Sequence, residues 1–299
     1  MSKYHRFFME KYFLFLLLFV ETAVAKPLKV VATVPFLVDL MENTTCRHSH
    51  YEVQSLIPVG VDPHTYVLTP QDRIALKNAD LVLQIGAHLE PWLGKIPMEA
   101  KQGRLVLSEH LPLRKIQSQN SSPLSEFDPH IWQSPQLTQK AAQVLKGYLS
   151  LKSSQDKDFL ETCTQKYLEK IQSTVVDLKK QVGTIPVQNR VIATNHDSLS
   201  YFAEAFGFQI YSILGLSDEA EPSFQQMQNL ISILKQKHIK SVFLESTGQT
   251  KNMETIAENA HIAVGGKLYG DSFGTLKSGA NTTLGLWQSN VSTLVKALK

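Results

Sequence analysis

Residues Asp156–Val182 read DKDFLETCTQKYLEKIQSTVVDLKKQV. The apolar side chains of this stretch recur at steps of three and four, which places them on one face of a single helix. These side chains are Phe159, Cys163, Tyr167, Ile171, Val175, Leu178 and Val182. Gly183 and Pro186 follow at once, and both residue types end helices. At 1.5 Å per residue the helix is about 40 Å long. Because that length exceeds one lobe, we expect the helix to bridge two lobes.

The chain on either side of this helix alternates between strand-like and helix-like segments. Before the helix, apolar runs predict strands at Leu28–Val34, Glu52–Pro58, Leu81–Ile85 and Arg104–Leu107, with helices at Thr69–Asn78 and Leu89–Ala100. After the helix, strands are predicted at Val191–Thr194, Phe208–Leu214, Ser241–Glu245 and Ala263–Leu268. Helices are predicted between them at Ser198–Phe206, Pro222–Lys237 and Lys251–Asn259. Strands that alternate with helices form parallel sheets.

The predicted fold class is therefore α/β. We expect two lobes, each with a parallel β-sheet flanked by helices, joined by one long linking helix. Residues 26–155 are assigned to the N-terminal lobe, 156–183 to the linking helix and 184–299 to the C-terminal lobe.

The first 25 residues have the pattern of a secretory signal peptide. Basic residues Lys3, Arg6 and Lys11 precede the apolar run Tyr12–Val20, and Ala23-Val24-Ala25 is typical of a signal-peptidase site. The nine apolar residues of this run are too few to span a bilayer, which needs about 20. Because no cysteine stands at the cleavage point, we expect an unlipidated protein of the periplasm.

The composition indicates a folded protein with a nearly balanced charge. Hydrophobic residues make up 43% of the chain and charged residues 19%, and the net charge is +3. No run of basic residues would follow a phosphate backbone, so nucleic acid is not expected as a partner.

Two cysteines and a neighbouring pair of histidines leave alternatives open. An oxidising compartment permits a disulfide between Cys46 and Cys163, but two cysteines so far apart do not establish one. Because Cys163 lies on the apolar stripe, we favour a buried free thiol. His48 and His50 share one face of an extended segment and could form a weak second metal site. A solvated turn is the favoured interpretation.

One catalytic motif is present, but the other residues that its mechanism needs are missing. Residues Gly270–Gly274 read GDSFG, which matches the G-x-S-x-G nucleophile elbow of α/β-hydrolases. That mechanism needs an acid and a histidine later in the chain, and no His, Asp or Glu follows Gly274. A hydrolase of this type is excluded. The chain also lacks Walker A, G-x-G-x-x-G, H-E-x-x-H and C-x-x-C motifs.

Three histidines and one aspartate lie where a binding site would form. His64 and His130 both end an Asp-Pro-His tripeptide, in which proline stiffens the turn and the aspartate could hold the imidazole. His196 directly follows a predicted strand, and Asp271 follows another. Because ligands of open α/β sheets bind at the carboxyl ends of the strands, all four residues could meet in one cleft between the lobes.

Four motifs, in this order, resemble a known family. GVDPHTYVLTPQD, DPHIWQSP, ATNHDSLSYFAEAFG and LYGDSFG are similar to the zinc/manganese class of solute-binding proteins of bacterial ABC transporters. The resemblance covers essentially the whole mature chain, including LEPWL at Leu89–Leu93 and the long helix. It implies that His64, His130, His196 and Asp271 bind the metal.

The resemblance also implies the cargo and the partners. Three imidazoles and one carboxylate suit four-coordinate zinc, whereas a carboxylate in place of His196 would favour manganese or iron. We therefore expect a non-enzymatic monomer that captures Zn²⁺ as cargo, with Mn²⁺ or Fe²⁺ as the alternative, and delivers it to the permease of an ABC transporter. The long helix would restrict closure of the lobes. The loop Gln117–Glu126 lacks the histidines that many zinc-binding members carry there.

Two further alternatives use the same residues. A secreted zinc hydrolase would need an open coordination position and a general base, for which Glu245 is the attractive residue. A surface adhesin on the same scaffold is disfavoured by the unlipidated signal peptide. The resemblance and the four-residue ligand set favour capture and transport of the metal.

Overall fold

The first half of the protein contains one four-stranded parallel sheet. The computed structural model describes residues 26–95, 103–116, 127–216, 221–248 and 250–299. The strands β1 (Leu28–Ala32), β2 (Tyr51–Ser55), β3 (Leu81–Gln84) and β4 (Gly103–Val106) pair in the order β2-β1-β3-β4. The first-half helices are α1 (Pro35–Thr44), α2 (Pro70–Asn78) and α3 (Pro135–Lys152). The predicted signal peptide, residues 1–25, and the loop Gln117–Glu126 lie outside the described residues.

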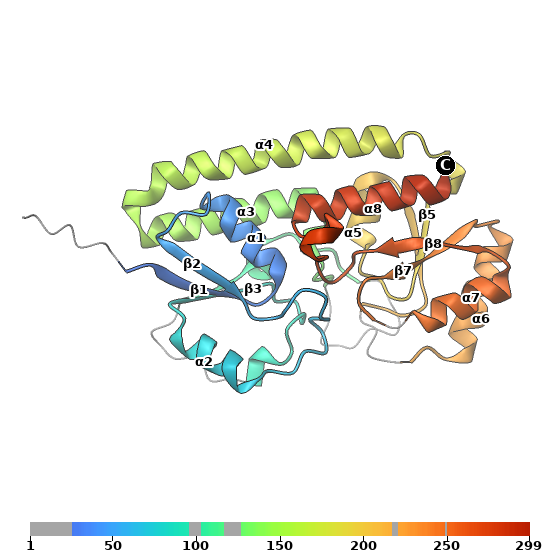
Figure 1. Cartoon of the computed structure of the whole chain (residues 1–299), viewed down its shortest axis with the longest axis horizontal. Helices are drawn as coiled ribbons and strands as arrows, with labels where there is room; N and C mark the ends of the chain where they lie inside the picture. The colour runs from blue at the N-terminus through green and yellow to red at the C-terminus, as the bar shows by residue number, and fades with distance from the viewer. Residues whose placement is uncertain (1–25, 96–102, 117–126, 217–220, 249) are drawn as a thin grey trace, which may run out of the picture.

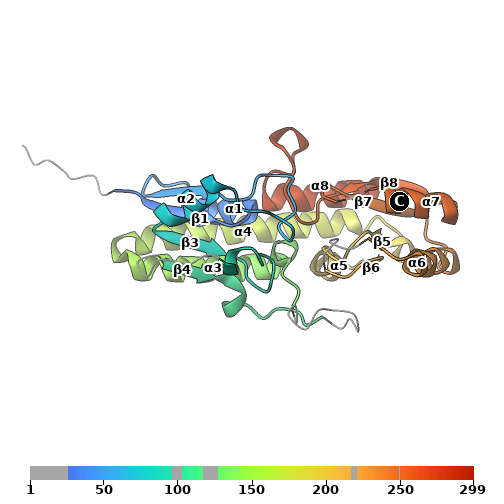
Figure 2. The same ribbon diagram turned by 90° about the horizontal axis from the view of Figure 1, so that it is seen from below.

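The second half contains two smaller parallel sheets. Strand β5 (Val191–Thr194) pairs with β6 (Gln209–Ser212), and β7 (Ser241–Glu245) pairs with β8 (Ala263–Leu268). The helices of this half are α5 (Ser200–Phe206), α6 (Phe224–Gln236), α7 (Lys251–Ala260) and α8 (Thr283–Leu298). Strands β5 and β7 lie next to each other, and Figure 2 shows these four strands at the opposite end of the molecule from β1, β3 and β4.

The long helix α4 (Lys157–Val182) connects the two halves, as the sequence predicts. It runs the length of the molecule above α3 and α8 (Figure 1). Its buried face packs against α1 and α3 of the first half and α5 and α8 of the second. The apolar stripe is on this face, with Tyr167 and Ile171 buried at its centre. The α/β class, the parallel sheets and the linking helix are therefore confirmed, whereas the residue limits of the lobes stay predictions.

Several elements differ from the sequence-based expectation. Helices α1, α3 and α8 were not predicted, although Pro35 and Pro135 each stand at the first position of a helix, where proline is favoured. The predicted helix at Leu89–Ala100 is wrong in its described part, which contains only a short 3-10 helix at Leu93–Lys95. No helix in the described ranges is long and apolar enough to cross a membrane.

The expectation of a free thiol at Cys163 is wrong. Cys46 and Cys163 form a disulfide, with their Cα atoms 5.6 Å apart. The interpretation of Cys163 as buried is right, since it is 2% exposed. The stripe that buries it is also the surface against which α1 packs. After α1 the chain turns through two left-handed residues, Cys46 and Arg47, with φ of 47° and 57°, and the first of them meets α4.

Candidate metal site

The loop after β2 carries His64 into the space between the two halves. Asp62 fixes this loop, because its Oδ1 accepts a hydrogen bond from the His64 amide at 2.8 Å. Its Oδ2 accepts one from the Thr65 hydroxyl at 3.0 Å. The carbonyl of Pro63 accepts a bond from the Trp92 indole at 2.8 Å. Neither ring nitrogen of His64 is hydrogen-bonded to Asp62.

The second Asp-Pro-His turn holds its histidine more firmly. The Oδ1 atom of Asp128 accepts the amide of His130 at 3.0 Å and also lies 2.8 Å from its Nδ1 atom. Because a carboxylate can only accept, this contact places the proton on Nδ1 and leaves Nε2 to face the site. His130 is fully buried. These contacts confirm the expectation that the preceding aspartate orients this histidine.

His196 and Asp271 come from strand ends of the second half. His196 follows β5, and its amide donates to Glu245 Oε1 at 3.0 Å while its Nδ1 lies 2.9 Å from Glu245 Oε2. Asp271 follows β8 by way of Gly270. A side chain at Gly270 would collide with Ser198 and Glu245, so glycine is required for this loop to approach His196.

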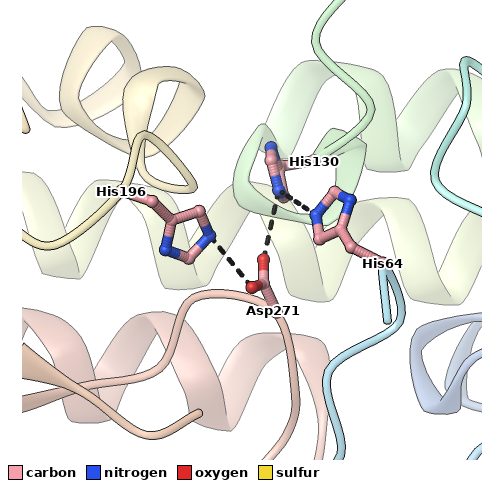
Figure 3. Close-up of side chains that lie close together, drawn as sticks. All are labelled: His64, His130, His196 and Asp271. Atoms are coloured by element: carbon pink, nitrogen blue, oxygen red, sulfur yellow. Dashed lines mark hydrogen bonds and ion pairs between the residues drawn. The ribbon is translucent and has the colours of Figure 1, made fainter. Parts of the chain in front are cut away.

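These four side chains converge on one point (Figure 3). The Nε2 atoms of His64 and His130 are 3.3 Å apart. Asp271 places Oδ1 3.1 Å from Nε2 of His130 and Oδ2 2.9 Å from Nε2 of His196. All four ligand atoms lie within 4.8 Å of one another. Donors about 2.0–2.1 Å from a tetrahedral zinc ion are separated by about 3.3 Å, so the cluster has the dimensions of a metal site.

The electrostatics of the cluster differ from one histidine to the next. Burial lowers the pKa of His64 to about 4. Burial also disfavours the charged form of His130, but the carboxylates of Asp128 and Asp271 outweigh it and raise its pKa to about 9. The pKa of His196 is likewise raised against the effect of burial, by Asp271 and Glu245. Burial favours the neutral form of Asp271, but the two cationic imidazoles overcome it and hold its pKa well below the usual range.

The structure changes the interpretation of Glu245. Both its oxygens are engaged, one by the His196 amide and the other by the Ser198 hydroxyl at 2.8 Å and the His196 ring. It therefore orients His196 and is not free to activate water as a general base. The sequence contained a signal for this role, because Glu245 is the polar residue that ends an apolar strand, SVFLE, beside the strand that leads to His196.

His48 and His50 are not part of this cluster. The His48 ring packs against those of Phe159 and His50, with centroids 4.8 and 4.3 Å away. His50 Nδ1 lies 3.5 Å from Asp156 Oδ1. Among the described residues, the one group with the geometry to hold a metal is the His64, His130, His196 and Asp271 cluster. Through Phe159 and Asp156, these contacts attach the turn that contains His48 and His50 to the start of α4.

A two-lobed α/β fold with a buried three-histidine, one-carboxylate cluster between its halves defines a metal-binding solute-binding protein. Residues 30–297 match the family described as "Zinc-uptake complex component A periplasmic". The chain belongs to this family, as the motifs in its sequence indicate. The family comprises solute-binding components of ABC transporters.

Individual relatives match the chain over most of its length and differ in the metal that their names state. The chain is 32% identical over 283 residues to "Manganese-binding lipoprotein MntA" of Bacillus subtilis, covering 91% of this chain and 90% of the relative. It is 31% identical over 281 residues to "Zinc-binding protein TroA" of Treponema pallidum, covering 91% and 89%. Since MntA is named a lipoprotein, the expectation of an unlipidated product stays a prediction.

Solved structures superpose on nearly the whole described chain. The periplasmic zinc-binding protein TroA of Treponema pallidum gives a TM-score of 0.82 at 28% identity, covering 91% of this chain and 99% of that one. A manganese-bound periplasmic metal-binding protein from Candidatus Liberibacter asiaticus gives 0.79 at 25% identity, with the same coverage.

Proposed function

We propose that the protein binds one divalent transition metal through His64, His130, His196 and Asp271 in the periplasm and delivers it to the permease of an ABC transporter. The observation that carries this proposal is the convergence of three Nε2 atoms and a carboxylate on one buried point. The outer nitrogens of His130 and His196 face carboxylates, which is the usual environment of metal-binding histidines.

Zinc is the cargo that we favour. Three nitrogen donors and one oxygen donor suit its four-coordinate preference, whereas manganese prefers oxygen-rich sites. Manganese or iron is the alternative, and one observation favours it: the two oxygens of Asp271 face different histidines, so the carboxylate could supply two donors to a larger ion.

The same geometry supports capture in place of catalysis. Four protein donors close the shell around an ion of zinc's size and leave no position for an activated water. Glu245, the residue that could serve as a base, is held by His196 and Ser198. We therefore propose that the protein is not an enzyme. We also propose that it acts as a monomer, as expected from the sequence.

The first experiment measures the metal content of protein purified from the periplasm without added metal. We expect about one equivalent of zinc per chain, and none in the quadruple alanine variant of His64, His130, His196 and Asp271. Manganese or iron in the parent protein would retain the site and overturn the choice of zinc. A parent protein that binds no metal, even when zinc is offered and the excess removed, would contradict the proposed function.

Cargo is then tested in cells, because zinc binds such a site in vitro whatever the physiological ion. A deletion strain is grown in medium depleted of zinc or of manganese. We expect a growth defect in the zinc-depleted medium that the wild-type gene restores and the quadruple variant does not. A defect confined to manganese depletion would assign the transporter to manganese.

A further inference from the structure

The loop that carries Asp271 is attached to the first half of the protein on both sides of this residue. The carbonyl of Gly270, which precedes it, accepts hydrogen bonds from the Trp132 indole and the Gln133 amide group, both at 2.8 Å. The hydroxyl of Ser272, which follows it, accepts a hydrogen bond from the Gly60 amide at 2.7 Å. Asp271 is thus bracketed by one attachment to the His130 turn and one to the His64 loop.

The bond to Gly60 reaches His64 through a short and well-fixed segment. Gly60 has a φ of +86°, a conformation that favours glycine, and its amide donates to Ser272. Four residues later, the His64 amide is bonded to Asp62, and the Pro63 carbonyl is bonded to Trp92. Because few free torsions separate Gly60 from His64, the position of the Gly60 amide sets the position of the imidazole.

We infer that Ser272 is a positioning residue that fixes the His64 loop against Asp271 and so limits the rate at which the metal leaves. Its hydroxyl joins the chain next to Asp271, in the second half, to the loop that carries His64, in the first half. Ser272 is only 3% exposed, whereas Gly60 lies at the surface, so the hydroxyl end of this bond is shielded from water. The inference rests on the proposed function, since it assigns a further residue to the same site.

The role differs from that of the bonds to Gly270. Trp132 and Gln133 belong to the 3-10 helix Ile131–Gln133, directly after His130, and both are buried. With a further bond from Gln133 to the Tyr269 carbonyl at 3.0 Å, three hydrogen bonds attach the Asp271 loop to the turn of His130. Among the described residues, one hydrogen bond attaches it to the His64 loop, so the attachment on the His64 side is the weaker one. Release of the metal should begin with separation of the His64 loop from Ser272.

The test compares Ser272→Ala and Ser272→Thr with the wild-type chain. Each protein is loaded with Zn²⁺ and mixed with an excess of a chromogenic chelator, and the dissociation rate is recorded by stopped flow. A hydrogen bond contributes a net of about 1 kcal/mol, so Ser272→Ala should release zinc about fivefold faster. The association rate should change less than about twofold. Ser272→Thr keeps the hydroxyl and should restore a rate near that of the wild type.

The matched control is Ser223→Ala. The Ser223 hydroxyl also accepts a backbone amide, that of Gln226 at the start of α6, but it lies outside the site. This variant should lower the thermal stability of the metal-free protein and leave the dissociation rate unchanged. Ser272→Ala should raise the dissociation rate, whatever its effect on the stability of the metal-free protein. A wild-type dissociation rate in Ser272→Ala, or equally fast release from Ser272→Thr, would overturn the inference without touching the proposed function, which fails only if the wild-type protein binds no metal.

Discussion

The protein contains the tripeptide Asp-Pro-His twice, at residues 62–64 and 128–130, and the two copies end in different surroundings. In the first, the two oxygens of Asp62 accept hydrogen bonds from the His64 amide and the Thr65 hydroxyl, and neither is hydrogen-bonded to the His64 ring. In the second, one oxygen of Asp128 serves both the amide and the ring of His130. The pKa of His64 is lowered to about 4, and that of His130 is raised to about 9.

The difference shows that the tripeptide fixes a turn and that the neighbours fix the chemistry. The next residue is threonine in one copy and isoleucine in the other, so only the first copy offers a hydroxyl that competes for the aspartate. His64 enters the site as a neutral ligand that is ready for a metal. His130 enters with a proton on each ring nitrogen, Nδ1 facing Asp128 and Nε2 facing Asp271. A metal must displace the proton on Nε2.

The largest expected effect comes from removing each histidine in turn. His130→Ala and His64→Ala should each weaken zinc binding by more than about 100-fold, because even the residues behind a metal ligand contribute 10- to 100-fold. The loss should be greater for His130→Ala, which also leaves the buried Asp128 carboxylate without its imidazole partner. Competition titration with a chelator of known affinity measures both.

His238→Ala is the control for these variants, since His238 lies outside the cluster. It should bind zinc as the wild-type chain does. A loss of similar size at His238, or wild-type affinity in either His64→Ala or His130→Ala, would contradict the assigned ligand set.

The next effect is the dependence of affinity on pH. The pKa of His130 is raised to about 9 and that of His196 above its ordinary value, so in the metal-free protein both rings favour the cationic form, which has a proton on Nε2 as well as on Nδ1. Zinc must displace the proton on Nε2 of each ring. The affinity for zinc should therefore rise as the pH is raised toward about 9 and fall as the pH is lowered. Each released proton changes the apparent affinity by about tenfold per pH unit.

Calorimetry in buffers of different ionisation enthalpy counts the protons that are released. We expect about two per zinc ion at pH 7, one each from His130 and His196, and none from His64. Release of no protons, with an affinity that is flat between pH 7.5 and 5.5, would contradict the difference between the two Asp-Pro-His copies.

The sequence predicted the four residues of the site but not how each would behave. Their positions followed from strand ends and stiff turns, and the family resemblance selected them. Two carboxylate contacts separate His130 from His64. The contact with Asp271 comes from a distant part of the chain, and the contact with Asp128 is local, but the tripeptide alone does not show that its carboxylate reaches the ring. Likewise, the stripe position of Cys163 predicted its burial and could not show that α1 would bring Cys46 to the same place.

The fold was predictable where one local pattern dominated. The alternation of strands and helices and the three- to four-residue period of α4 are such patterns. Helix α8 was missed because its sequence contains glycine and β-branched residues that disfavour an isolated helix. It forms through burial of Leu286, Trp287 and Leu294. The two separate sheets of the second half also depend on packing between elements, which no single segment reveals.

The smallest expected effect tests the comparison most directly, by removing the charge of each aspartate without removing its oxygen. Asp128→Asn keeps an oxygen that accepts hydrogen bonds from the His130 amide and ring. It loses the negative charge that makes the imidazole a stronger electron-pair donor to the metal. Zinc affinity at pH 8 should fall by about 10-fold, at the lower end of the range for residues behind a metal ligand. Asp62→Asn still accepts the His64 amide and should cost less than about threefold, because Asp62 does not touch the ring.

The pH profile separates an electrostatic role of Asp128 from a structural one. Asp128 is among the groups that raise the pKa of His130, so Asp128→Asn should lower that pKa and release fewer protons on zinc binding. Its affinity should then change less between pH 8 and pH 6 than that of the wild-type chain, while the profile of Asp62→Asn stays unchanged. If both variants kept the wild-type profile, the raised pKa of His130 would have to come from Asp271 alone. The two copies of the tripeptide would then differ only in how their imidazoles lie relative to Asp271, because Asp128 would support the shape of its turn in the same way as Asp62.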